Sequence, residues 1–142
     1  MKHKILLVDD EEKMIKYLSR HLIKKGFDVS TACSGIAALE KVREQDFAVV
    51  LLDVLMPGMD GIETLREIKK IKPLTEVIMV TGHASVEVGI EGMKLGAFDY
   101  VIKPFDLTEL VTKIHKAYDQ RIYHEKGIEA VDIPEMPSKK PS

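Results

Sequence analysis

Apolar residues along the chain fall into two alternating patterns. Continuous apolar runs occupy residues 5–8, 47–52 and 77–80, as expected for strands that are covered on both faces. Residues 27–31 alternate between apolar and polar, like a less buried strand, and residues 100–102 have the composition of a short strand. The pattern therefore predicts five strands.

Between the strands, apolar residues recur at the spacing of a helix. The predicted stripes are Met14, Leu18 and Leu22; Ala38, Leu39 and Val42; Ile62, Leu65 and Ile68; Val86, Ile90 and Met93; and Leu110, Ile114 and Ala117. The last four helices each follow a residue that can cap the first turn, namely Ser34, Asp60, Ser85 and Asp106. Because Gly89 and Gly92 lie within the fourth stripe, we expect that helix to be the least stable.

Strands that alternate with helices predict an α/β fold. Parallel neighbours need long, right-handed crossovers, so we expect a doubly wound, five-stranded parallel sheet with helices on both faces, in the common strand order 2-1-3-4-5. The periodicity stops near residue 126, and three of the six prolines lie in the last nine residues. We expect one domain over residues 1–124 and a disordered tail or linker at 125–142.

Composition and charge exclude several classes of function. The net charge of -2 gives no broad cationic field, so nucleic acid is not an expected direct partner. The longest apolar run is too short to cross a membrane and no secretory signal is apparent, which favours a cytoplasmic location. Cys33 is the only cysteine, which excludes an internal disulfide and a multi-cysteine zinc site, and we expect it to be buried as a small apolar residue.

Three carboxylates follow two strands that should be neighbours. Asp9 and Asp10 come after the first strand and Asp53 comes after the third, so all three should meet in the crevice where the strand order reverses. Crowded carboxylates either become protonated or bind a cation, and Mg²⁺ prefers such oxygen ligands. Alternatively, Asp9 and Asp10 only cap a helix, and Asp53 is a loop carboxylate ahead of a Met-Pro-Gly turn.

Two further strand ends bring a hydroxyl and an ammonium to the same edge. Thr81 ends the fourth strand and Lys103 ends the fifth. Each alone would be an ordinary turn residue or a solvated lysine. Together with the carboxylates and Mg²⁺ they could neutralise a bound phosphoryl group.

Four separated motifs share an order and spacing with a known family. They are ILLVDDEE at 5–12, VVLLDVLMPGMDG at 49–61, MVTGHAS at 79–85 and GAFDYVIKPF at 96–105. Over residues 4 to about 122, the chain resembles the receiver domains of two-component response regulators, the chemotaxis-regulator-like phosphoacceptor domains. The resemblance implies a flavodoxin-like (βα)5 fold.

The resemblance also implies a role for each site residue. Asp53 matches the phosphoacceptor, Asp9 and Asp10 match the acidic pair that organises Mg²⁺, Thr81 matches the switch hydroxyl and Lys103 matches the family's lysine. In such domains the carboxylate takes a phosphoryl group from a phosphohistidine of a sensor histidine kinase. The domain catalyses its own phosphorylation and dephosphorylation without being a classical enzyme.

Further positions follow from the same resemblance. Tyr100 matches the aromatic switch position, the backbone carbonyl of Leu55 would bind the metal, and the bond before Pro104 is expected to be cis. Leu55 and His83 occupy the positions that tune the rate of dephosphorylation. The expected output surface comprises the fourth helix, the fifth strand and the fifth helix, which would contact a partner, an output domain or a second copy.

Three other functions remain alternatives. A flavodoxin-like electron carrier shares the fold class, but the acidic residues 9–12 would repel the cofactor's phosphate. A Mg²⁺-dependent phosphatase is a second alternative, but its aspartyl nucleophile normally follows the first strand, whereas here the best nucleophile, Asp53, follows the third. An interaction module that works unphosphorylated is disfavoured because every matched site residue is present. The chain is expected to be either a stand-alone receiver or a piece of a longer regulator.

Overall fold

The computed structural model describes residues 4–54, 60–82 and 86–127, in which strands and helices alternate as predicted. The strands are β1 (Lys4–Val8), β2 (Asp28–Ala32), β3 (Val49–Asp53), β4 (Glu76–Thr81) and β5 (Asp99–Ile102). The helices are α1 (Glu12–Lys24), α2 (Gly35–Glu44), α3 (Gly61–Ile71), α4 (Val86–Lys94) and α5 (Leu107–Glu125).

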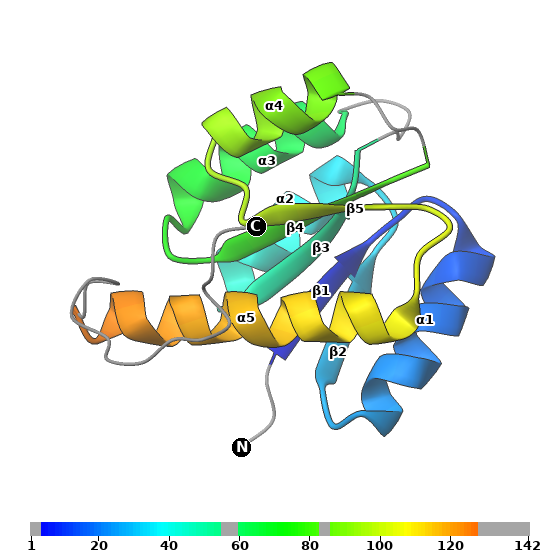
Figure 1. Ribbon diagram of the computed structural model, residues 1–142. Coiled ribbons are helices and arrows are strands. Elements are labelled where there is room, and N and C mark those ends of the chain that lie inside the picture. Colours follow the sequence, from blue (N-terminus) through cyan, green and yellow to red (C-terminus); the bar gives the residue numbers. More distant parts are fainter. Residues whose placement is uncertain (1–3, 55–59, 83–85, 128–142) are drawn as a thin grey trace.

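The strands form one parallel sheet in the order β2-β1-β3-β4-β5, which confirms the predicted α/β fold class (Figure 1). β1 pairs with β2 on one side and with β3 on the other. The strand order therefore reverses between β1 and β3, as a doubly wound sheet requires.

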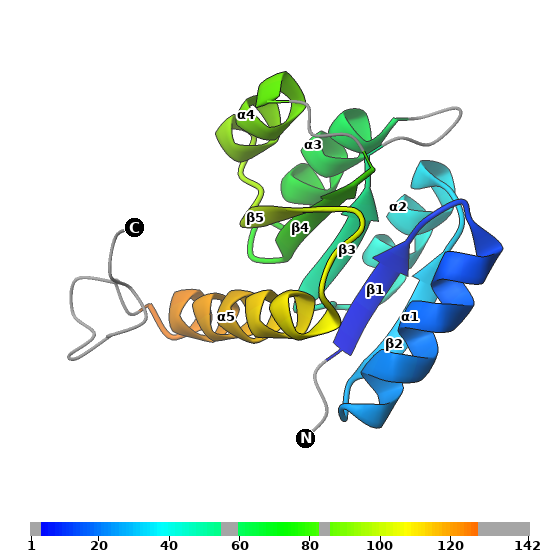
Figure 2. The ribbon, with the colours of Figure 1, turned by 45° about the vertical axis from the view of Figure 1, so that its right-hand side comes forward.

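Helices cover both faces of the sheet, so the apolar core is divided into two layers (Figure 2). One layer lies between the sheet and α2, α3 and α4 and includes Leu39 and Leu65. The other lies between the sheet and α1 and α5 and includes Leu18 and Ile114. Because both faces are covered, β3 and β4 are buried along their whole length.

Three of the predicted helix caps are present. The side chains of Ser34, Asp60 and Asp106 each accept a hydrogen bond from a backbone amide in the first turn of the helix that follows. The fourth predicted cap, Ser85, lies outside the described residues. The residue before each of these three helices therefore determines where the helix begins.

The predicted apolar stripe of α4 is wrong. Ile90 and Met93 are 52% and 44% exposed, and of Val86 only the backbone is described. The side of α4 that is buried carries Gly89 and Gly92, and a Cβ atom at Gly92 would overlap the thioether of Met79 on β4. The glycines let the helix approach the sheet closely, and Ile90 and Met93 face solvent, whereas Val88 is half-buried against the core.

Cys33 is also not where we expected it, because its side chain is exposed. It lies in the connection between β2 and α2, not on a covered face of either element. Residues 128–142 of the predicted tail lie outside the described part of the chain. No helix within the described ranges is long and apolar enough to span a membrane.

Candidate functional site

The reversal of the strand order brings the predicted acidic residues to one edge of the sheet. β1 and β3 are in register with Val8 opposite Leu52, so Asp9 and Asp53 follow paired positions. The amide of Asp9 donates to the carbonyl of Ala32 at 3.1 Å, which continues the pairing of β1 with β2 beyond the last residue of the strand. The two carboxylates therefore stand on rigid, hydrogen-bonded backbone.

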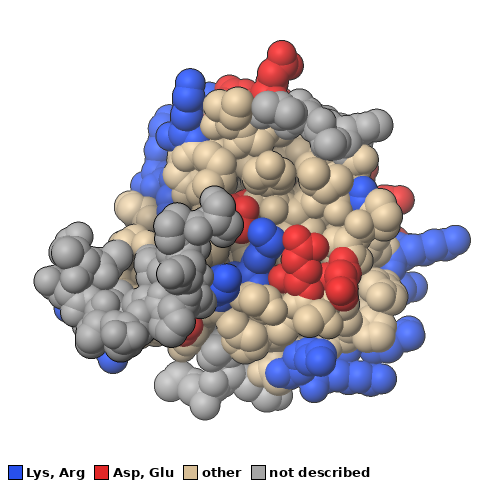
Figure 3. All heavy atoms as spheres, viewed as in Figure 1, with Lys and Arg blue, Asp and Glu red and all other residues tan. Residues whose placement is uncertain are grey.

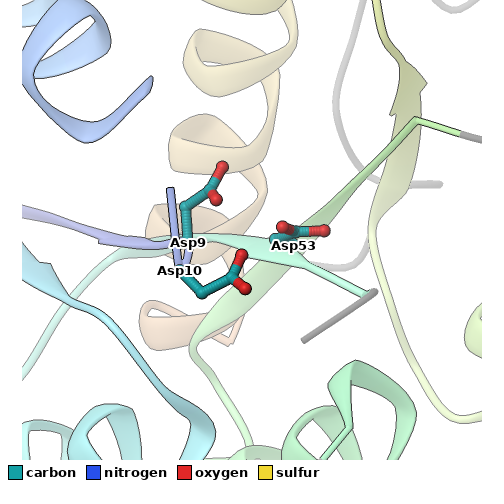
Figure 4. A group of neighbouring side chains, drawn as sticks. All are labelled: Asp9, Asp10 and Asp53. Carbon is teal, nitrogen blue, oxygen red and sulfur yellow. The ribbon is translucent and has the colours of Figure 1, made fainter. Parts of the chain in front are cut away.

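Asp9, Asp10 and Asp53 form one acidic cluster (Figure 4). Each contributes a carboxylate oxygen, and these oxygens lie within 4.8 Å of one another. Asp9 and Asp53 are only 2% and 5% exposed, whereas Asp10 is open to solvent and its carboxylate is directed towards Asp53. Anionic oxygens beside an open position fit a hard dication that keeps some of its water, as Mg²⁺ does.

Asp9 serves a local role as well. Its Oδ1 accepts a hydrogen bond from the amide of Glu11 at 2.9 Å, next to the start of α1. This contact resembles the capping interaction that was the alternative interpretation of Asp9. It occupies one carboxylate oxygen and leaves Oδ2 facing the site, so the two interpretations are compatible.

Lys103 follows the edge strand β5, and its side chain reaches the acidic cluster. Its Nζ lies 3.3 Å from Oδ2 of Asp9 and 3.9 Å from Oδ2 of Asp53, and its side chain is only 17% exposed. The amide of Lys103 donates to the carbonyl of Thr81 at 2.7 Å, and its peptide bond to Pro104 is cis. The ammonium therefore offsets part of the negative charge and is not the solvated lysine of the alternative interpretation.

The two predicted switch residues lie on neighbouring strands. Thr81 ends β4 and is 7% exposed. Tyr100 on β5 is 41% exposed, and its ring lies against α4, because a Cβ atom at Gly89 would be 3.6 Å from the ring. Tyr100 thus contacts the helix whose glycines face the sheet.

Two residues at this edge were not singled out from the sequence. Oε1 of Glu11 lies 3.7 Å from Nζ of Lys103, so Glu11 adds a third carboxylate around the ammonium. Gly61 begins α3 against the backbone of Val54, where any side chain would overlap it. The acidic run after β1 pointed to Glu11, but nothing in the local sequence indicates the close approach at Gly61. Two predicted positions, Leu55 and His83, lie outside the described residues.

Comparison with known families gives one match over most of the chain. The model of the response regulator receiver domain matches residues 5–115. Among curated proteins, the transcriptional regulatory protein ZraR of Escherichia coli strain K12 is 47% identical over 113 residues, which are 80% of this chain and 26% of that protein. The regulatory protein AtoC of the same strain is 43% identical over 115 residues, which are 81% and 25% of the two chains. The chain thus spans about a quarter of the length of these two relatives.

Solved structures with the same fold include separate domains and longer proteins. A CheY-like response regulator receiver domain protein from Methanospirillum hungatei JF-1 has a TM-score of 0.84 at 31% identity, covering 87% of this chain and 99% of that one. NtrX from Brucella abortus, in complex with ADP, has a TM-score of 0.83 at 30% identity, covering 89% of this chain and 29% of that one.

Proposed function

This chain belongs to the family of response regulator receiver domains, and from that premise we propose that Asp53 accepts a phosphoryl group from a sensor histidine kinase. The observation that carries the proposal is the position of Lys103, whose Nζ is close to the carboxylates of Asp53 and Asp9 at the same time. A phosphoryl group needs positive charge on its oxygens and an anionic nucleophile in line with phosphorus. The chain's own residues supply both.

The proposed transfer is a direct displacement on phosphorus. A carboxylate oxygen of Asp53 bonds to phosphorus while the bond from phosphorus to the histidine nitrogen of the kinase breaks, which produces an aspartyl phosphate. Lys103 pairs with a phosphoryl oxygen and stabilises the charge that develops there. Attack by water later releases phosphate and restores the carboxylate. The domain would thereby catalyse its own modification and its reversal.

Asp9, Asp10 and Asp53 would hold the Mg²⁺ that this transfer needs. When bound, the ion supplies charge neutralisation for the phosphoryl oxygens, and it relieves the repulsion among the three carboxylates. The backbone carbonyl of Leu55 remains an expected further ligand from the resemblance.

The proposed output is a change of the surface formed by α4, β5 and α5. Thr81 would turn its hydroxyl towards a phosphoryl oxygen, and Tyr100 would move into the space that this movement leaves. Support comes from four exposed apolar residues on α4 and β5: Ile90, Met93, Tyr100 and Ile102. In Figure 3 the uncharged area above the middle of the molecule covers the region of α4 and β5, and a groove of about 370 Å³ runs between them.

A downstream protein, a further domain or a second copy of the chain would bind this surface, and we infer a cytoplasmic location for the whole exchange. Direct contact with nucleic acid is not part of the proposal. The flavin-carrier alternative lacks support at the site, because carboxylates line the position where such a cofactor would place its phosphate.

The test of the proposal is the intact mass of the protein after incubation with acetyl phosphate. The wild-type chain should gain the mass of one phosphoryl group with Mg²⁺ and not without it. Asp53→Asn should abolish the gain, because an amide is not an anionic nucleophile. Asp28→Asn, at the opposite end of the sheet, is the matched control and should be modified normally. Undiminished phosphorylation of Asp53→Asn would overturn the assignment.

A further inference from the structure

The last turns of α5 carry a buried arginine that the proposed chemistry does not use. Arg121 is 6% exposed, and two of its partners, Asp46 and Phe47, lie in the segment that leads into β3. This is the amino-terminal edge of the sheet, whereas Asp53 lies at the carboxyl-terminal end of the same strand. Arg121 therefore acts at the opposite end of the domain from the acidic cluster.

Arg121 is held by hydrogen bonds in three directions. Nη1 donates to the carbonyl of Phe47 at 2.9 Å, Nη2 to Oδ2 of Asp46 at 2.6 Å, and Nε to Oε2 of Glu125 at 2.7 Å. The carbonyl of Phe47 also accepts from the hydroxyl of Thr75 at 2.9 Å. A guanidinium presents donors in a rigid planar fork, so this set of partners fixes its orientation as well as its position.

Neighbouring contacts attach the same part of α5 to β4. Nδ1 of His124 lies 3.6 Å from Oε2 of Glu76, whose residue is 5% exposed. Lys69 of α3 donates to the carbonyls of Pro73 and Thr75 at 2.9 and 2.7 Å, which holds the turn before β4 in place. The end of α5 therefore contacts the amino-terminal ends of two central strands, β3 and β4.

The other half of α5 is attached to a different part of the molecule. Lys113 donates to Oδ2 of Asp99 at 2.6 Å, and Asp99 precedes Tyr100 on β5. One end of α5 thus contacts the strand of the proposed switch, and the other end contacts the base of the sheet. The described chain continues from α5 through Lys126, whose amide donates to the carbonyl of Ile122 in the last turn of the helix.

We infer that the hydrogen bonds of Arg121, which we call the Arg121 latch, fix the direction of the last turns of α5 and so the direction in which the chain leaves the domain. This direction is the same whether or not Asp53 is phosphorylated. The independence from phosphorylation rests on the proposed function, whereas the role of Arg121 in fixing the end of α5 does not. If the direction of the last turns of α5 is constant, phosphorylation of Asp53 is signalled through the exposed surface of α4 and β5. A rotation of the end of α5 does not carry the signal.

The test measures the direction of the last turn relative to the body of the domain. Spin labels are attached to Glu40→Cys on α2 and Lys126→Cys at the end of α5, with Cys33→Ser removing the native exposed thiol. Electron–electron resonance then gives the distribution of distances between the labels. With Arg121 intact we expect a narrow distribution that does not shift when Mg²⁺ and the phosphoryl mimic beryllofluoride are added.

Arg121→Met should lose the narrow distribution, and Arg121→Lys should lose most of it, because an ammonium cannot satisfy the same fork of acceptors. Lys113→Met, which breaks the other ion pair of α5, is the matched control and should leave the distribution narrow. A distribution that stays narrow in both Arg121 variants, which must show a native circular dichroism spectrum, would overturn the latch. A shift on adding beryllofluoride to the wild-type background would overturn the independence from Asp53, and mass spectrometry reports separately whether Asp53 is modified.

Discussion

At the scale of single residues, the charge balance around Asp53 is the central feature of the site. The buried carboxylates of Asp9 and Asp53 lie beside the largely buried ammonium of Lys103, so each of these buried charges has an oppositely charged neighbour. Asp10 completes the acidic cluster as its exposed member. Isolated charges would be costly in this position, and the pairing reduces the cost. The exposed member, Asp10, is the residue that solvent and a metal ion can reach directly.

Asp10 is therefore the best residue at which to test metal binding. Asp10→Ala removes one anionic oxygen from the cluster without leaving a buried charge unpaired, because Asp10 is exposed. We expect the affinity for Mg²⁺ to fall by roughly tenfold or more, which corresponds to about 1.4 kcal/mol. Titration with Mg²⁺ followed by NMR measures it, and Asp28→Ala serves as the control. Unchanged affinity in Asp10→Ala would refute the assignment of the metal ligands.

Glu76 predicts a pH dependence at the other end of the sheet. Burial raises the pKa of Glu76 above 4.5, although Lys69, His124 and Arg121 oppose the shift. The folded state therefore favours the protonated form, and its stability decreases as the pH rises from the ordinary pKa through the raised one. Glu76→Gln keeps the shape and removes this loss, so its stability relative to the wild type should increase between acid and neutral pH.

Urea unfolding below pH 4.5 and at neutral pH measures this difference. Glu40→Gln, an exposed carboxylate on α2, controls for the loss of one charge. If the difference between Glu76→Gln and the wild type decreases towards neutral pH, the ion pairs of Glu76 outweigh its burial and the prediction is wrong.

At the scale of elements, α4 combines weak intrinsic stability with an exposed apolar surface. Gly89 and Gly92 each cost a helix about 1 kcal/mol relative to alanine. The same glycines allow close contact with Tyr100 and Met79. A helix of this kind can be shifted by a difference of a few contacts, as a two-state switch requires.

The expected consequence is a localised response to phosphorylation. When beryllofluoride and Mg²⁺ are added, amide hydrogen exchange should change most within residues 82–110. The reason is that β4, which ends at Thr81, lies between β3 with Asp53 and β5 with Tyr100. Residues of α1 and α2 serve as the internal reference. Larger changes in those two helices would show that the signal takes another route.

The pattern of apolar residues predicts a helix well where large side chains make the contact with the sheet. In α5 the predicted stripe of Leu110, Ile114 and Ala117 is fully buried. In α4 the rule fails because the buried positions described in the helix are Gly89 and Gly92, which carry no apolar signal. A pattern based on side-chain hydrophobicity cannot detect a contact that depends on the absence of a side chain.

At the scale of the whole molecule, the strand order and the edge that carries the acidic residues follow from the alternation of strands and helices, because parallel crossovers permit few topologies. The proximity of Asp9 and Asp53 could therefore be predicted. The contacts of Arg121 with Asp46 and Phe47 could not, since they join residues that are far apart in the chain and have no shared motif. Long-range contacts of single polar side chains require the structure.

The pairing of β1 with β3 has a consequence for folding. Lys4–Val8 and Val49–Asp53 are separated by two helices and a strand, so their pairing must close a long loop before it gains any hydrogen bond. A segment of the chain must extend from residue 9 to residue 53 to contain the complete acidic cluster. A nascent or partly folded chain that lacks this pairing would therefore lack the site proposed for phosphoryl transfer, and only molecules that have completed the centre of the sheet would carry it.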